Sequence, residues 1–195
     1  IGLLRAVAQA AGVEVFRKGE YTSDPFRAWQ KISVFEAFQK YANIDIEKDW
    51  LPELNKENTE EWDARFFKVF MEQIEPYLGQ GVPTILYDYP AHMAALSKVK
   101  ESNPKVAERF EIYVCGLELA NAFTELTDAE IQRKRFEHDM QQKQAIYGST
   151  WPIDRDFIAA LNHGMPEAGG IALGVDRLVM LACGADHIKD VLFCE

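Results

Sequence analysis

Residues 169–178 read GGIALGVDRL, and this stretch decides the fold. Its apolar run between glycines predicts a strand, and Asp176 predicts the opening of a helix that reaches about Leu181. Glycines beside a strand let a ligand approach the backbone closely. The following helix N-terminus offers unpaired N–H groups and a positive dipole end, which suit a phosphate. Arg177, in the first turn of that helix, could pair with a phosphate oxygen and stack on an aromatic base.

The same stretch also has a purely structural interpretation. It would then be a tight strand-to-helix turn, with Asp176 as an ordinary N-cap and Arg177 solvated. The residues of this stretch alone leave both interpretations open.

A second segment, residues 116–128, reads GLELANAFTELTD and places carboxylates and an amide in an apolar strand. Burying such groups is costly unless they are paired or bound to a ligand. Glu118 and Glu125 are seven residues apart, which puts them on opposite faces of a regular strand. Sharing a ligand requires a bulge or turn between them, expected at Asn121-Ala122, and would create a site for Mg²⁺ on nucleotide phosphates. Alternatively, both carboxylates lie on the outer face of an edge strand.

Outward from these two segments, the pattern predicts strands and helices without regular βαβ alternation. Such a pattern favours an α+β domain with an antiparallel sheet flanked by helices. The predicted strands are 84–89, ended by Pro90, and 109–119; the predicted helices are 3–11, one from the capping box at Ser33 and Glu36 toward Tyr41, one from Thr59 with Trp62, Phe66, Phe67, Phe70 and Ile74 on one face, 128–145 and 153–162.

Composition limits the class of protein. The 195 residues, 48% of them hydrophobic, suffice for one sizeable core, and no apolar run is long enough to cross a bilayer. The net charge of −10 opposes a sequence-independent grip on nucleic acid. Three cysteines without metal-ligand spacing predict free thiols in a reducing, cytoplasmic compartment. Because the chain begins at Ile1 inside a helical pattern, we expect a fragment.

The two glycine- and glutamate-rich segments carry a resemblance. Residues 170–178 resemble motif 3 of class II aminoacyl-tRNA synthetases, and residues 118–128 resemble the preceding strand of lysyl-tRNA synthetases. With YDYPA at 87–91, AERFE at 107–111 and GLELAN at 116–121, the chain looks most like the elongation factor P–lysine ligases, which are lysyl-tRNA synthetase paralogues. The sequence pattern indicates a mainly helical N-terminal or insertion segment over 1–80, and the resemblance implies the C-terminal part of the catalytic core, including motif 3, over 81–195.

The resemblance also implies roles for particular residues. Glu118 and Arg177 would be catalytic, with Glu118 contacting ATP and Arg177 stacking on adenine. The other implied roles are nucleotide packing for Leu119, the adenosine pocket for Gly174, binding of lysine or β-lysine by Glu125, Asn121 and Ala172, and Mg²⁺ held by Glu118 and Glu125. The amino acid would become an adenylate and pass to a lysine of elongation factor P.

The chain also departs from the family pattern. Segments resembling synthetase motifs 1 and 2 are absent, and residues 16–20, FRKGE, only superficially match motif 2. Ala122 stands where the family has glycine, while Ala172 favours the ligase over the tRNA synthetase. The alternatives are a lysyl-tRNA synthetase fragment or a non-catalytic binding paralogue. We expect tRNA to be an improbable partner, no membrane association, and a homodimeric full-length parent.

Overall fold

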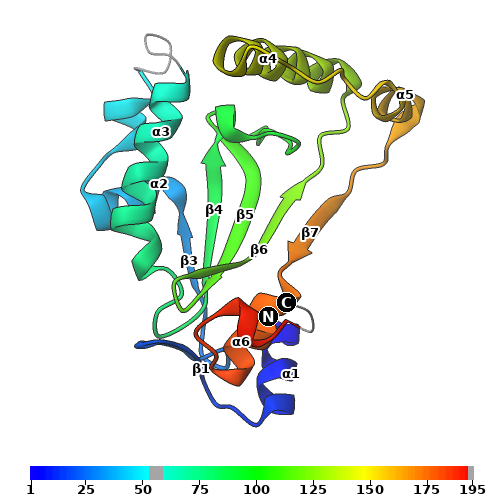
Figure 1. Cartoon of the computed structure of the whole chain (residues 1–195). Coiled ribbons are helices and arrows are strands. Elements are labelled where there is room, and N and C mark those ends of the chain that lie inside the picture. The colour runs from blue at the N-terminus through cyan, green and yellow to red at the C-terminus, as the bar shows by residue number, and fades with distance from the viewer. Residues whose placement is uncertain (53–58, 193–195) are drawn as a thin grey trace. The chain divides into compact units, whose positions relative to one another are not determined.

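A computed structural model describes residues 1–52 and 59–192, with both helices and strands along the chain (Figure 1). Short π-helical turns at 38–42, 46–50 and 70–74 and 3₁₀ turns at 75–77, 91–93 and 188–190 link the main elements. These main elements are α1 (Gly2–Ala11), β1 (Phe16–Lys18), β2 (Tyr21–Ser23), β3 (Gln30–Ser33), α2 (Val34–Ala37), α3 (Thr59–Val69), β4 (Thr84–Pro90), β5 (Val106–Val114), β6 (Leu117–Thr124), α4 (Ala129–Tyr147), α5 (Arg155–Gly164), β7 (Gly169–Leu173) and α6 (Val175–Cys183).

The main sheet is mixed, so the predicted antiparallel sheet is wrong in one strand pair. Its five strands have the order β3-β4-β5-β6-β7, and β3 pairs in parallel with β4, with Ile32 opposite Leu86. Parallel neighbours need a long crossover connection. The chain from α2 through α3 provides that crossover, and the sequence pattern at residues 30–33 was too short to predict a strand. The α+β class itself is confirmed.

The predicted single strand over 109–119 is also wrong, because the chain reverses there. β5 ends at Val114, β6 begins at Leu117, and the two residues between them have left-handed backbone conformations, with φ of 54° at Cys115 and 70° at Gly116. Two consecutive positive φ values are what a two-residue type I′ hairpin requires. The turn is fixed from outside by Cys115 N–H and Gly116 N–H, which donate to the carbonyls of Gly79 and Leu78.

The chain divides into two compact units, and each is described separately. The first unit comprises residues 1–89, 110–122 and 171–195, and the second comprises 90–109 and 123–170. In the first unit, buried residues of α1, β1, the β5–β6 hairpin and α6 form one core that includes Leu4, Phe16, Leu119 and Leu178. In the second unit, α4 packs against α5 through Ala129, Ile158 and Leu161. The boundary near residue 80 stays a prediction, and β1, β2 and β3 precede it.

Helix starts follow the predicted capping chemistry. The Ser33 hydroxyl accepts from Glu36 N–H, and the Glu36 carboxylate accepts from Ser33 N–H, so the predicted capping box is confirmed. Asp128 caps α4 by accepting from the N–H groups of Glu130 and Ile131. The predicted N-cap role of Asp176 is wrong, because Gly174 occupies that position of α6 without a side-chain cap.

Aromatic rings connect α3 to the sheet within the first unit. Trp62, Phe66 and Phe70 stack along α3, with centroids 5.4 Å and 6.0 Å apart, and Phe70 meets Tyr113 of β5 at 6.2 Å. Three of these rings lie four residues apart in sequence, so they share one helix face. Phe67, predicted on that face, is 46% exposed instead. The aromatic column therefore positions Tyr113, which belongs to the polar site described next.

Candidate functional site

Glu118 and Arg177 meet in the first unit. One Arg177 guanidinium nitrogen, Nη1, donates to the backbone carbonyl of Glu118 at 2.6 Å and lies 3.8 Å from its carboxylate. The Arg177 side chain is 43% exposed and the Glu118 side chain is 37% exposed, so a ligand can reach both. A partly solvated ion pair contributes little stability by itself. The structure thus brings together the two residues predicted to be catalytic, one from β6 and one from the first turn of α6.

A backbone hydrogen bond between Gly174 and Leu119 holds Glu118 and Arg177 next to each other. Gly174 N–H donates to the carbonyl of Leu119 at 2.9 Å, which ties the start of α6 to β6. A methyl group added at Gly174 would lie 3.3 Å from the Cδ of Arg177, a tight contact. The Leu119 side chain is only 2% exposed and belongs to the core. This burial does not favour the predicted packing of Leu119 against a nucleotide.

Asn121 contacts a buried carboxylate that sequence reasoning missed. Glu111 of β5 is 6% exposed and accepts hydrogen bonds from Asn121 Nδ2 at 3.0 Å and from the Tyr113 hydroxyl at 2.8 Å. Burial, then the charge of Glu111, raises the pKa of Tyr113, so the phenol stays a donor. A glutamate two residues before a tyrosine in an apolar strand was the available signal, because both then lie on one face.

Glu75 adds a further carboxylate to this region. Burial raises the pKa of Glu75, and the charges of Glu118 and Glu111 raise it further, whereas Arg177 and Lys18 lower it. Acidic groups from three different segments of the first unit therefore act on one another, beside a single arginine. Such a concentration of negative charge attracts cations.

β6 is one continuous strand from Leu117 to Thr124. Glu118 and Glu111 both act electrostatically on Tyr113, while Asn121, three residues after Glu118, contacts Glu111. A regular strand would send Glu118 and Asn121 to opposite faces. Leu119 and Ala120 are both buried in the core, and the bulge expected at Asn121-Ala122 stays a prediction. Ala122 is buried, and among the described residues it is not one with positive φ, so no left-handed strain arises.

Glu125 and Ala172 are the remaining residues predicted to contact the amino acid. Glu125 belongs to the second unit, where its N–H donates to Ala168 O at 2.9 Å. Its carboxylate fills the space beside Gly170, where an added methyl group would come within 2.8 Å of Oε1. Ala172 is exposed on β7 of the first unit. Their contact with an amino acid, and a metal shared by Glu118 and Glu125, stay predictions.

These side chains fit a Mg²⁺ ion that is held partly by the protein and partly by a bound nucleotide. Among residues 1–52 and 59–192, no three histidine, cysteine, aspartate or glutamate side chains are grouped to hold a metal. Mg²⁺ commonly binds through one or two carboxylates together with substrate phosphates and water. Glu118, partly exposed within an acidic region, suits a cation that arrives with a nucleotide.

Comparison with known proteins establishes the family. The profile of the class II tRNA synthetases for D, K and N matches residues 3–194, nearly the whole chain. The chain belongs to the class II tRNA synthetase family. The match therefore also includes residues 3–80, which the sequence alone assigns to a mainly helical N-terminal or insertion segment. The segments that resemble motif 3 and its preceding strand form β7–α6 and β6.

Within this family, curated relatives include ligases of elongation factor P. The chain is 44% identical over 176 residues to the elongation factor P–(R)-β-lysine ligase of Proteus mirabilis, which covers 85% of the chain and 54% of the relative. The corresponding ligase of Photorhabdus laumondii is 42% identical over 84% of the chain and 54% of the relative. That of Pectobacterium carotovorum is 46% identical over 67% of the chain and 40% of the relative. The chain thus spans about half the length of these relatives.

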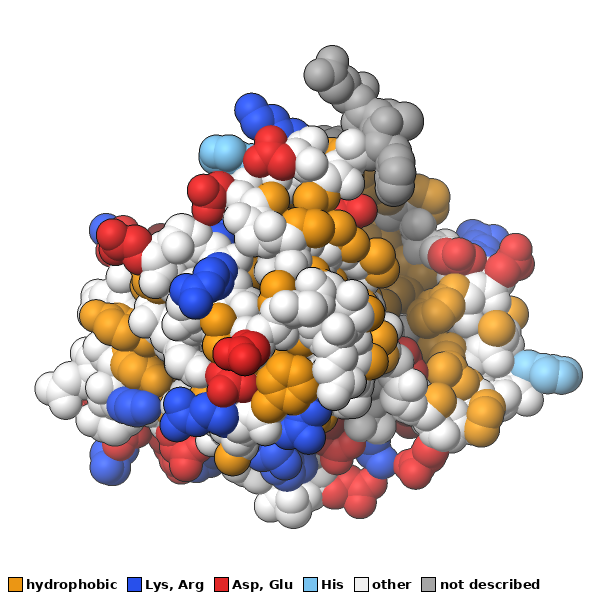
Figure 2. Space-filling model, turned by 90° about the horizontal axis from the view of Figure 1, so that it is seen from below, with side chains coloured by type: hydrophobic (Ala, Val, Ile, Leu, Met, Phe, Trp, Pro, Cys, Tyr) orange, Lys and Arg blue, Asp and Glu red, His pale blue; other side chains and the backbone are white. Residues whose placement is uncertain are grey.

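Other surfaces of this class II synthetase chain carry few signals of chemistry. Acidic and basic side chains are interspersed on the face shown in Figure 2, without a continuous basic tract. None of the helices within residues 1–52 and 59–192 combines the length and apolar character needed to cross a bilayer. Cys115 is a buried free thiol and Cys183 an exposed one, while Cys194 lies outside the described residues.

Proposed function

We propose that this chain is the nucleotide- and amino-acid-binding part of an ATP-dependent ligase that activates lysine or (R)-β-lysine and transfers it to elongation factor P. The amino-acid carboxylate would attack the α-phosphate of ATP, giving an aminoacyl adenylate and pyrophosphate. An acceptor lysine amine would then take the acyl group and release AMP. The names of the relatives support the ligase over a tRNA synthetase, and family membership supports adenylate formation.

The observation that carries the proposal is the Glu118–Arg177 contact. Two oppositely charged, partly exposed side chains are held next to a helix N-terminus by the Gly174–Leu119 hydrogen bond. In our proposal Arg177 binds phosphate and adenine, and Glu118 orients Mg²⁺, which would neutralise phosphate charge when bound. Positioning and charge neutralisation account for most of the catalysis in such reactions.

We further propose that Asn121 and Glu125 bind the amino acid and that Ala172 shapes its pocket. We also propose that the enzyme is located in the cytoplasm. The Glu111–Asn121 hydrogen bond supports the role of Asn121, because it fixes the orientation of the Asn121 amide. Family membership supports the role of Glu125, which lies in the segment that resembles the lysyl-tRNA synthetase strand. Glu118 and Glu125 together remain our proposed ligands for Mg²⁺.

Nucleotide binding by the chain tests this proposal directly. ATP with Mg²⁺ is titrated calorimetrically into the chain and into its Arg177→Ala and Arg155→Ala variants. We expect Arg177→Ala to weaken binding at least roughly tenfold, the effect of losing a charged hydrogen bond, and Arg155→Ala to leave it unchanged. Equal binding by both variants would remove Arg177 from the nucleotide site.

A further inference from the structure

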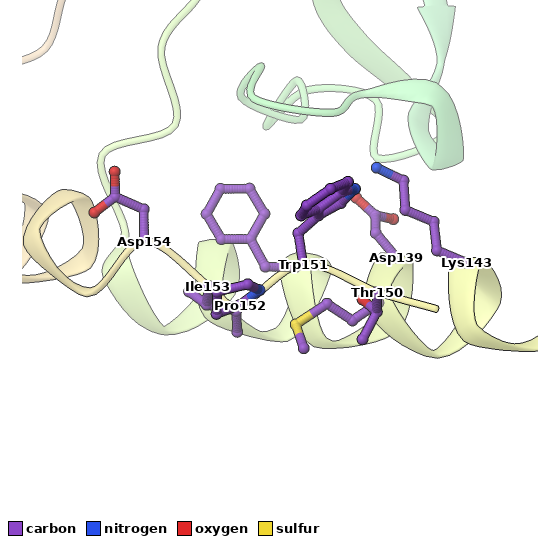
Figure 3. Close-up of a pocket in the computed structure, with 9 residues that line it drawn as sticks. Asp139, Lys143, Thr150, Trp151, Pro152, Ile153 and Asp154 are labelled. Atoms are coloured by element: carbon purple, nitrogen blue, oxygen red, sulfur yellow. The ribbon is translucent and has the colours of Figure 1, made fainter. Parts of the chain in front are cut away.

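Two cavities lie along α4 in the second unit, and their charges differ. The cavity of about 270 Å³ shown in Figure 3 is formed by α4 and residues 150–154, with Trp151 beside Asp139 and Lys143. Two aspartates and one lysine line it, which leaves no excess of positive charge. A second cavity, of about 430 Å³, lies between the 3₁₀ turn Ala91–Met93 and α4.

The second cavity concentrates basic groups on an acidic protein. Lys134, Arg135, His92 and His138 line it, against the single carboxylate of Asp139. Lys134 is exposed, and within the described part of the chain no carboxylate lies within salt-bridge distance of its ammonium group. The neighbouring Arg133, by contrast, pairs with Glu130 at 3.9 Å. Lys134 is therefore available to a ligand that enters this cavity.

Arg135 makes the wall of the cavity rigid. Its Nη1 donates to the carbonyls of Ala95 at 2.6 Å and Ser97 at 2.8 Å, which joins α4 to the segment after the 3₁₀ turn. Ala95 has a φ of 50°, a conformation that costs energy for a residue other than glycine and that these bonds maintain. A preformed wall lowers the entropic cost of binding a ligand.

The remaining lining is apolar. Met93 and Ile131 face the cavity together with two alanines, and Ile131 is 45% exposed. A volume of this size lies within the range of ligand pockets. A suitable ligand thus combines one anionic group with an adjacent apolar group.

We propose that this cavity binds a glutamate or aspartate side chain, next to an apolar residue, on a partner protein. Nucleic acid is the less favoured occupant, because binding a phosphate backbone needs several cations along a track and the chain carries a net charge of −10. The inference rests on contacts within the second unit alone. Its test uses neither ATP nor amino acid, so its failure is distinct from failure of the proposed ligase function.

The test is a titration of the ¹⁵N-labelled chain with the blocked dipeptide acetyl-Leu-Glu-amide, followed by amide chemical shifts. Shifts are expected at Met93, Lys134 and His138, and acetyl-Leu-Gln-amide should bind at least roughly tenfold more weakly. Lys134→Glu should weaken binding of the glutamate peptide by a similar factor. Arg133→Glu, the same charge change one residue earlier, should alter it by less than about twofold.

The apolar part has its own matched pair. Ile131→Ser should weaken binding, whereas Ile146→Ser should not, because Ile146 is equally exposed on the same helix at 44% but lies outside the cavity. Absence of shifts, equal binding of the two peptides, or equal losses in Lys134→Glu and Arg133→Glu would overturn the proposal. Tighter binding of single-stranded RNA that depends on Lys134 would overturn it in favour of nucleic acid.

Discussion

The position of the Arg177 side chain depends on the absence of a side chain at Gly174. Gly174 leaves the space that the Arg177 side chain occupies, since an added methyl group would lie 3.3 Å from Cδ. We predict that Gly174→Ala displaces the guanidinium and weakens ATP binding roughly threefold to tenfold, as expected for a weakened charged hydrogen bond. Calorimetric titration with ATP checks this. Gly2→Ala is the control, because Gly2 has open space around it; unchanged affinity in Gly174→Ala would contradict the role given to this glycine.

At the residue scale, sequence reasoning singled out two partly exposed members of the candidate site, Glu118 and Arg177, and missed the buried Glu111. Glu118 and Arg177 stand out in the sequence because a glycine-flanked strand followed by the N-terminus of a helix is typical of phosphate-binding sites. Glu111 does not stand out, since its function depends on burial and on Asn121, which comes from another strand.

Among the elements, α2 begins at a capping box whose strength depends on pH. Backbone and side-chain hydrogen bonds from Ser33 lower the pKa of Glu36, so the ionised carboxylate stabilises the folded chain above its ordinary pKa. That contribution is lost as pH falls through the lowered folded value. We predict that Ser33→Ala costs about 1 kcal/mol of unfolding free energy at pH 7 and less below about pH 4. Urea denaturation of the unaltered chain and of Ser33→Ala, at pH 7 and below about pH 4, measures the difference in unfolding free energy.

The control for the cap is Ser149→Ala, an exposed serine in the turn after α4. It should change the unfolding free energy by less than about 0.5 kcal/mol at either pH. A Ser33→Ala cost that is the same at pH 7 and below about pH 4 would show that the bond from the Ser33 hydroxyl to the Glu36 carboxylate does not stabilise the cap.

The aromatic column on α3 offers a second test of an element. Phe66 is 1% exposed, whereas the next residue, Phe67, is 46% exposed. We predict that Phe66→Ala costs about 3–5 kcal/mol of unfolding free energy, because it leaves a cavity between stacked rings, and that Phe67→Ala costs less than about 1 kcal/mol. Denaturant unfolding of both variants measures the difference. Similar costs for the two would contradict the burial of the Phe66 face.

Elements with strong local signals were predictable, and those set by tertiary pairing were not. The polar helix formers from Asp128 onward predicted α4, and the β-branched and aromatic content of residues 84–89 predicted β4. The β5–β6 turn was missed because its first residue is Cys115, which has a left-handed φ that favours glycine. β3 was missed because its four residues are a strand only through parallel pairing with β4.

For the whole molecule, the chain spans about half the length of its ligase relatives. Adenylate formation needs the α-phosphate held from the side that motif 2 normally supplies. Loss of a preorganised charged contact of that kind lowers the rate by roughly 10²–10³. We therefore predict negligible lysine-dependent exchange of pyrophosphate into ATP by the chain alone. Robust exchange would show that Arg17, in the segment that superficially matches motif 2, or another group replaces the missing contact.

Transfer of labelled amino acid tests the central claim most directly. In a chimera, this chain replaces the matching segment of the Proteus mirabilis ligase, and it is supplied with ATP, labelled lysine or (R)-β-lysine, and either elongation factor P or tRNA. We predict ATP-dependent label on elongation factor P, lost in the Arg177→Ala chimera. Label on tRNA alone, or no transfer by the chimera where the unaltered Proteus enzyme is active, would contradict the proposed function.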